Sequence, residues 1–184
     1  MRKIFLFLIV CSIFSFELYA QDCKLKGVVR YKHNDYVGYK LDVGAEVYVV
    51  SKKGAVKFDM DTWSEYEKLA KGYMEYLKVK EDDEIPPAYR SLFTSWKETD
   101  KVRLDSIDGI STFMYLENVK KAIDLTIVDN SGQYELKLPK GDYYVIFVSK
   151  NRTRPTVTEL LNRVHIEEIS LDTPVKLLSY DFDY

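Results

Sequence analysis

Hydrophobic and polar residues alternate with a period of two in several short stretches of this chain of 184 residues. Such alternation predicts β-strands, because successive side chains of a strand point to opposite faces of its sheet. One stretch, 143–149, is apolar at both odd and even positions, which is typical of a central strand covered on both faces. The predicted strands are 23–31, 44–50, 123–127, 134–138, 143–149, 164–169 and 175–182.

Turn residues punctuate these strands. Asp129-Asn130-Ser131-Gly132 has the composition of a hairpin turn, in which Gly132 takes the left-handed backbone that a bulge requires. Pro139 and Gly141 suit the second and fourth positions of a type I turn. Gly27 indicates a bulge in the first strand, and 33–42 is expected to be a polar loop.

The middle of the chain changes to helical spacing. Thr62 and Glu65 have the spacing of a capping box, and apolar residues then recur every three or four positions up to Leu77. A second helix is expected to begin near Pro87, followed by a stripe formed by Tyr89, Leu92, Phe93 and Trp96. The two helices are predicted to form an antiparallel hairpin.

Residues 102–121 have no decisive period. Asp105 is suited to cap a third helix, whereas residues 110–115 read equally well as a strand. The helical part, about 59–121, lies between the second strand and the strand-rich half. It is therefore interpreted as an insertion into a mostly β fold, an antiparallel sandwich.

Two groups of residues resemble the carboxypeptidase regulatory-like domain, a transthyretin-like (prealbumin-like) β-sandwich. The first group is Gly27-Val28-Val29 with Gly44-Ala45-Glu46-Val47-Tyr48-Val49, and the second is Asp129, Gly132, Tyr134, Pro139, Gly141 and Tyr143. The resemblance covers about half of the chain. It implies an antiparallel Greek-key sandwich and a folding, spacer or binding module, which in that family accompanies a peptidase or an outer-membrane nutrient receptor. Here the module would stand alone.

The N-terminus has the features of an export signal. Arg2 and Lys3 precede an apolar run from Ile4 to Phe16, and Ala20 ends the segment. The run is too short for a membrane-spanning helix, so we expect residues 1–20 to be a cleaved signal and residues 21–184 to form one domain. Cys23 follows Asp22, which does not fit a lipid-anchored protein. The product is expected to be periplasmic or secreted, without a transmembrane segment after signal removal, and it resembles exports of the Bacteroidetes group.

The charge and the cysteine content of the chain bear on its possible partners. After signal removal the chain would carry 25 Lys and Arg against 28 Asp and Glu, a balance that does not predict nucleic acid as a partner. Cys23 would be the single cysteine, interpreted as a small residue in the first strand rather than a link to another molecule.

The sequence has no convincing pattern of residues that is typical of a catalytic site. His165 and Glu168 have the spacing of a zinc pair, but residues three apart on a strand point to opposite faces, and His33 is the only other histidine. His165 is therefore interpreted as a surface residue. No nucleophile motif or phosphate-binding loop is present, so no catalytic, metal or cofactor site is predicted and the chain is not expected to be an enzyme.

Binding is the remaining class of function. The predicted role is a binding or scaffold module for a protein or glycan of the cell envelope, with the helical insertion as contact surface. The alternatives are a small glycan- or peptide-processing hydrolase and a structural subunit of a surface assembly. The candidate contact residues are aromatic residues of the insertion and basic residues of a later loop: Tyr76, Trp63, Trp96, Lys150, Arg152 and Arg154.

Overall fold

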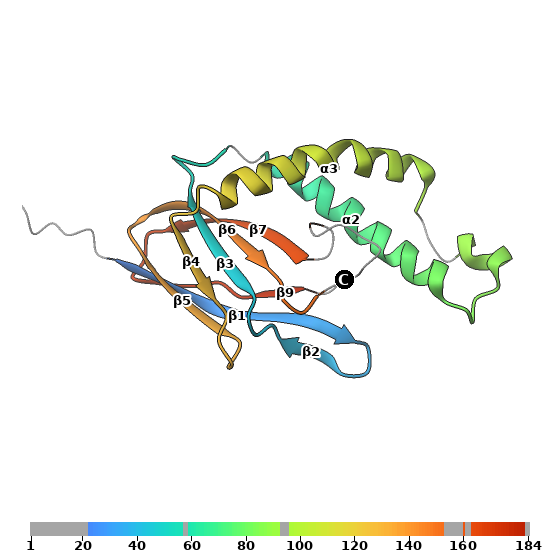
Figure 1. Ribbon diagram of the computed structural model, residues 1–184, viewed down its shortest axis with the longest axis horizontal. Helices are drawn as coiled ribbons and strands as arrows, with labels where there is room; N and C mark the ends of the chain where they lie inside the picture. The colour runs from blue at the N-terminus through green and yellow to red at the C-terminus, as the bar shows by residue number, and fades with distance from the viewer. Residues whose placement is uncertain (1–21, 57–58, 93–95, 153–159, 161–162, 183–184) are drawn as a thin grey trace, which may run out of the picture.

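The computed structural model describes residues 22–56, 59–92, 96–152, 160 and 163–182. Within these residues nine strands form two sheets, and two long helices lie along the outer face of one of them (Figure 1). The chain is therefore mostly β, a sandwich of two sheets with a helical layer on one side. The predicted signal segment, residues 1–20, lies outside the described residues.

Sheet I is built around β1 (Cys23–Asn34). β5 (Gln133–Leu138) and β2 (Gly38–Leu41) pair antiparallel with successive parts of β1. β8 (Val175–Leu177) and β9 (Tyr180–Phe182) pair with β1 in parallel, so the expectation of a wholly antiparallel sandwich is wrong at this edge. The predicted loop 33–42 contains β2, because the chain turns back after Asn34 and continues the sheet.

Gly27 lies in regular pairing with Tyr134, so the predicted bulge is wrong. The glycine is needed for another reason. A Cβ atom at this position would lie 1.7 Å from the carbonyl oxygen of Leu178, which the Tyr134 hydroxyl also contacts as a donor at 2.6 Å. The backbone between β8 and β9 therefore lies in direct contact with β1 at Gly27. Only glycine, which has no Cβ atom, leaves room for this contact.

Sheet II has the order β4 (Asp124–Ile127), β3 (Glu46–Ser51), β6 (Gly141–Val148) and β7 (Val164–Leu171), all antiparallel. The prediction that 143–149 forms a central strand is confirmed. Alternate β6 side chains enter two different apolar cores, one between the sheets and one between sheet II and the helices. Tyr143, Val145 and Phe147 belong to the first core, and Tyr144, Ile146 and Val148 to the second.

The helical layer follows β3 and precedes β4. It consists of α2 (Met60–Glu81), the short 3₁₀ helix η1 (Pro87–Leu92) and α3 (Glu98–Val119). α2 and α3 run side by side in opposite directions, as expected of a hairpin (Figure 1). The second helix of the hairpin is α3, not one beginning at Pro87, because the segment after the two prolines makes only η1. Of the two possibilities left open for residues 102–121, the helix is correct.

The ends of these helices use other caps than those predicted. Asp59, not Thr62, begins α2: its Oδ1 accepts hydrogen bonds from the backbone N–H groups of Asp61 at 3.2 Å and Thr62 at 3.4 Å. α3 begins at Glu98, well before Asp105. At this end of the helix the Asp100 carboxylate accepts a hydrogen bond from Lys97 N at 3.0 Å. In the described part of the chain, no helix combines the length and the apolar character needed to cross a membrane.

Candidate functional site

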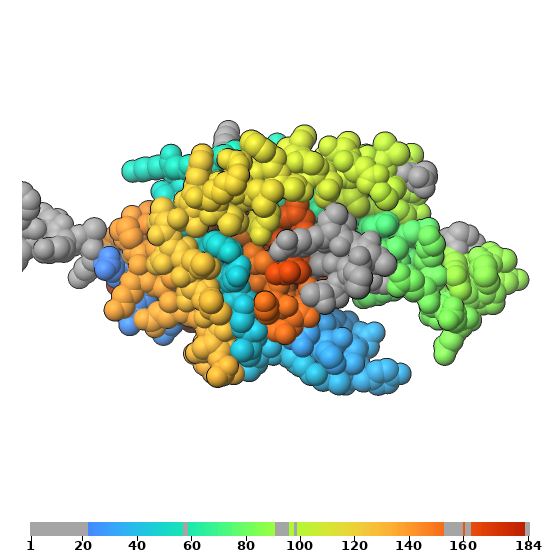
Figure 2. Space-filling model, viewed as in Figure 1, coloured from blue at the N-terminus to red at the C-terminus, as the bar shows by residue number. Residues whose placement is uncertain are grey.

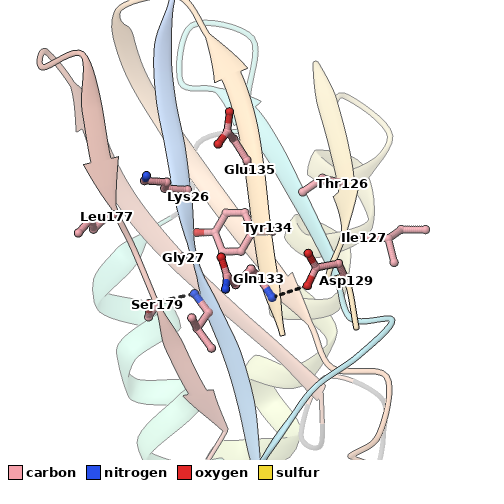
Figure 3. A pocket seen from close by; sticks show the side chains of 11 residues that line it. Lys26, Gly27, Thr126, Ile127, Asp129, Gln133, Tyr134, Glu135, Leu177 and Ser179 are labelled. Atoms are coloured by element: carbon pink, nitrogen blue, oxygen red, sulfur yellow. Dashed lines mark hydrogen bonds between the residues drawn. The ribbon is translucent and has the colours of Figure 1, made fainter. Parts of the chain in front are cut away.

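The outer face of sheet I carries a groove of about 650 Å³. β1 and β5 form its floor, with β8 and Ser179 on one side and the end of β4 on the other (Figure 3). The helical layer covers sheet II and leaves this face open (Figure 1). A volume of this size is in the usual range of ligand sites. The lining residues are Lys26, Gly27, Val28, Thr126, Ile127, Asp129, Gln133, Tyr134, Glu135, Leu177 and Ser179.

Several polar groups of the groove have hydrogen-bonding capacity to spare. Among the residues that the structure describes, the Lys26 ammonium, the Gln133 amide and the Thr126 hydroxyl have no side-chain partner. The Ser179 hydroxyl accepts a hydrogen bond from Val28 N at 3.0 Å, and its own proton remains available to donate. Figure 3 shows Lys26 and Gln133 on neighbouring strands at the centre of the groove. The floor therefore offers both donors and acceptors.

The two carboxylates of the groove are already engaged. Asp129 Oδ1 accepts hydrogen bonds from Ser131 N, Ser131 Oγ and Gln133 N at 2.7–2.9 Å. These bonds, that from the Ser131 side chain first, hold the pKa of Asp129 below its usual value. Glu135 lies 3.2 Å from Lys24 Nζ in an ion pair. Asp129 therefore shapes the turn beside the groove. Gly132 has the predicted left-handed backbone, with φ 75°, but the predicted hairpin is wrong, because the turn joins β4 of sheet II to β5 of sheet I.

Apolar side chains border the groove at both ends. Leu177 is 71% exposed on the β8 side, and Ile127 is 61% exposed on the β4 side. Tyr134 supplies no exposed ring, because it is buried against Phe147 and burial raises the pKa of its hydroxyl. A ligand would contact polar groups at the floor and aliphatic groups at the borders.

The predicted aromatic contacts lie elsewhere, in the helical layer. Trp63 is 1% exposed and packs in the core between sheet II and the helices, so it has no surface for a partner. Tyr76 and Trp96 are half-buried and stack on each other at 6.5 Å between ring centroids, and Tyr73 joins both. Trp96 also lies against Gly72, where a Cβ atom would meet its ring at 3.1 Å. Trp96 therefore packs closely on α2 at this glycine.

The predicted basic contacts do not form one surface in the described residues. Lys150 is exposed, Arg152 is half-buried with Nη1 3.5 Å from Lys32 O, and Arg154 lies outside the described residues. Asp42 organises this loop. Its buried Oδ1 accepts hydrogen bonds from Lys150 N, Asn151 N and Asn151 Nδ2 at 2.8–3.2 Å.

His165 is buried, so its interpretation as a surface residue is wrong. Its Nδ1 lies 2.6 Å from Glu67 of α2 and its Nε2 lies 3.1 Å from Glu167, while its ring stacks on Tyr180 at 3.7 Å between centroids. Burial alone would lower the pKa of His165, but the two carboxylates outweigh burial and raise it. His165 therefore ties the helical layer to the edge of sheet II.

Glu168, the other half of the suspected zinc pair, points away and pairs with Lys52. His33 is exposed and lies edge-on to Tyr31. Within the described ranges, no group of three or more His, Cys, Asp or Glu side chains is arranged to hold a metal ion.

Sequence reasoning missed the groove. Lys26 and Glu135 stand at outward-facing positions of two predicted strands, and Gln133 directly precedes the predicted strand 134–138. The alternation indicates that Lys26 and Glu135 face the solvent. These residues line one groove only because β1 pairs with β5 and because β8 and β4 lie on either side of that pair. No local sequence pattern predicts this arrangement.

No protein-family model matches the sequence, and no curated protein matches it. Among solved structures, a candidate carbohydrate binding protein from Pseudomonas aeruginosa is similar over 93% of this chain and 94% of that chain, with 9% identity and a TM-score of 0.41. Two structures of the pilus backbone protein from Streptococcus pneumoniae are similar at 12% identity. They cover 88% and 79% of this chain but 30% and 34% of theirs, with TM-scores of 0.31 and 0.26.

The chain thus spans about a third of the length of the pilus protein chains. Similarity at these TM-scores identifies neither a family nor a function. The two facing sheets are established by the strand pairing itself, whereas the resemblance to the carboxypeptidase regulatory-like domain has no matching family model behind it.

Proposed function

We propose that this chain is an exported, non-enzymatic binding module, and that the groove on sheet I holds a hydroxyl-rich ligand such as a stretch of cell-envelope glycan. In this proposal residues 21–184 form one domain with Greek-key, transthyretin-like connectivity and residues 1–20 direct its export. The observation that carries the proposal is the groove itself, a hollow of about 650 Å³ on a rigid sheet face with uncommitted polar groups.

The chemistry of the lining favours a sugar chain. Each sugar hydroxyl both donates and accepts hydrogen bonds, and the groove offers a donor at Lys26, an amide at Gln133 and hydroxyls at Thr126 and Ser179. Leu177, which borders the groove on the β8 side, is placed to cover the apolar C–H face of a sugar ring. Because these residues stand on strands or directly beside one, their backbone is already ordered before a ligand binds, and binding has only side chains to order.

The same lining argues for binding rather than hydrolysis. A glycosidase needs two carboxylates that flank the scissile bond, one of them free to exchange a proton. Here Asp129 is held by three hydrogen bonds of its own turn, and Glu135 is paired with Lys24. That the helical insertion forms a contact surface stays a prediction. Its aromatic side chains Tyr76 and Trp96 stack on each other.

The test is a printed array of bacterial envelope oligosaccharides, followed by calorimetric titration of each glycan that the purified chain retains. The double variant Lys26→Ala/Gln133→Ala is expected to weaken binding about tenfold, since each lost hydrogen bond contributes about 0.5–1.5 kcal/mol. The control is Lys137→Ala/Lys140→Ala, which removes two exposed lysines outside the groove.

Two results would overturn the proposal. One is retention of no glycan by the wild-type chain. The other is equal affinity of the wild type and the groove variant for the glycans that are retained. Backbone NMR shifts on titration locate the contact independently, and are expected to concentrate on β1, β5 and the end of β4.

A further inference from the structure

A second surface, separate from the floor of the groove, exposes large apolar side chains on α3 and β4. Figure 2 shows the C-terminal half of α3 lying directly above β4 on one face of the molecule. Six large apolar side chains of this region are each 47–61% exposed: Ile110, Phe113, Leu116, Ile123, Leu125 and Ile127. Their exposed area is on the order of 600 Å², the upper end for the largest apolar patch of a typical monomer.

β4 is also an open edge of sheet II. It pairs with β3 on one side, and among the described residues no strand pairs with its other side. Val128 N donates to Ala45 O of the β3 side, so the alternation of an antiparallel ladder directs the main-chain groups of Leu125 and Ile127 outward. Consistent with this, Leu125 N donates to the Asp124 side chain at 2.8 Å instead of to β3.

This edge is complementary to itself. In an antiparallel pair of two β4 strands with the two-fold axis at Leu125, the outward N–H and C=O groups of each Leu125 meet those of the other copy. Ile127 of one copy then lies opposite Ile123 of the other, so apolar residues face apolar residues. Just beyond the strand, exposed Lys121 of one copy comes opposite exposed Asp129 of the other, so opposite charges meet.

We propose that a second copy of this chain docks on this surface, pairing β4 with β4 and joining the two four-stranded sheets into one. The α3 helices of both copies then flank the junction, and Phe113 and Leu116 cover it. The apolar area per copy approaches the roughly 800 Å² that each partner contributes to a standard interface. Asp124 releases the Leu125 N–H to the partner strand. The inference does not rest on glycan binding.

The first experiment is sedimentation velocity of the purified chain at about 100 µM, where a dimer with a micromolar Kd is almost wholly assembled. The wild type is expected to be a dimer and Leu125→Lys a monomer, with the far-UV circular dichroism of Leu125→Lys unchanged. Val175→Lys is the matched control, because Val175 is a similarly exposed apolar strand residue of sheet I, and it is expected to remain a dimer. A monomeric wild type, or dissociation of both variants alike, overturns the proposal.

The register has its own test. The two-fold axis brings the Leu125 positions of both copies opposite each other, at a Cα separation of about 5.5 Å that suits a disulfide. Leu125→Cys is therefore expected to form a covalent dimer under mild oxidation, and Val175→Cys is not. A dimer in which the introduced thiols fail to link, or link equally at both positions, contradicts β4 pairing. Glycan titration of Leu125→Lys separates this inference from the proposed function, because Leu125 does not line the groove.

Discussion

The molecule has two apolar cores that share strand β6 but are held together in different ways. The core between the sheets is lined mostly by strand residues, and main-chain ladders join the strands that carry them. Among the described residues, the core between sheet II and the helices has the same number of buried aromatic residues, four, and side-chain bonds between distant segments lie around it. Tyr66 donates to Asp108 at 2.8 Å, Asn118 Nδ2 donates to Val56 O at 3.0 Å, and His165 contacts Glu67 at 2.6 Å.

The difference teaches which part of the fold is self-sufficient. Hydrogen-bonded ladders and alternating apolar residues together stabilise the sandwich core, and each strand pair supports the next. The helices have no ladder to sheet II, so their position depends on apolar packing and on a few specific polar contacts. We therefore expect the sandwich to unfold as a unit, and the helical layer to open locally at a lower free energy.

The largest effect is expected from equal truncations in the two cores. Phe147→Ala and Trp63→Ala each remove a fully buried ring, and each is expected to cost about 3–5 kcal/mol. Hydrogen exchange followed by mass spectrometry distinguishes them. Phe147→Ala should reduce protection in both sheets, whereas Trp63→Ala should reduce it in α2 and α3 and leave β1 and β5 protected. Equal loss of protection in β1 with both variants would contradict the independence of the sandwich.

The next effect concerns the C-terminal edge of the sandwich. Gly27→Ala places a methyl group against the Leu178 carbonyl, and backbone cannot move aside as a side chain can, so we expect a loss of about 2–3 kcal/mol. Urea unfolding measures the loss, and limited proteolysis should show earlier cleavage near residues 172–179. Gly54→Ala is the control, since the nearest atom to its Cβ is 3.9 Å away. Equal stability of the two variants would rule out the close approach.

A smaller, pH-dependent effect is expected at the link between the cores. The pKa of His165 is raised, so its ion pairs contribute stability that is fully present below its ordinary pKa of 6.5 and is lost as pH rises through the raised value. Glu67→Gln removes one carboxylate and is expected to cost about 1–3 kcal/mol near pH 6, with wild type and variant converging as the pH rises above the raised pKa of His165.

Unfolding curves across this pH range measure the effect, and an NMR titration of the His165 ring measures its pKa directly. The control is Glu65→Gln on the same helix, which breaks an exposed pair with Arg103 and should cost less than about 1 kcal/mol. The same pH dependence in both variants would remove His165 as the cause.

The smallest effect is a gain. Gly109 lies inside α3, and a Cβ atom added there would have no neighbouring atom within 4 Å, so Gly109→Ala should raise stability by about 0.5–1 kcal/mol through helix propensity. Gly72→Ala is expected to gain less, because the ring of Trp96 must shift to admit the methyl group. Thermal unfolding of both variants measures the difference, and a larger gain at Gly72 would argue against tight packing there.

Local patterns predicted much of the sandwich. The apolar run 143–149 correctly indicated a strand buried on both faces. Asp129 and Gly132 correctly indicated a turn, but it joins β4 of sheet II to β5 of sheet I and closes no hairpin. The same reasoning failed for α3. Its apolar residues lie on both faces, with Ile110 and Phe113 exposed, so no clean helical period remained to separate helix from strand.

By itself the sequence determined most of the strands, though not β2, together with the main turns and the presence of a helical segment between β3 and β4. These depend on residues within a few positions of one another, whose backbone preferences and alternation act locally. Only the tertiary structure decided that β8 and β9 run parallel to β1, that His165 is buried between Glu67 and Glu167, and that Lys26 and Gln133 share a groove. Each of these depends on packing between segments far apart in the chain, and such contacts form only when the whole fold brings the segments together.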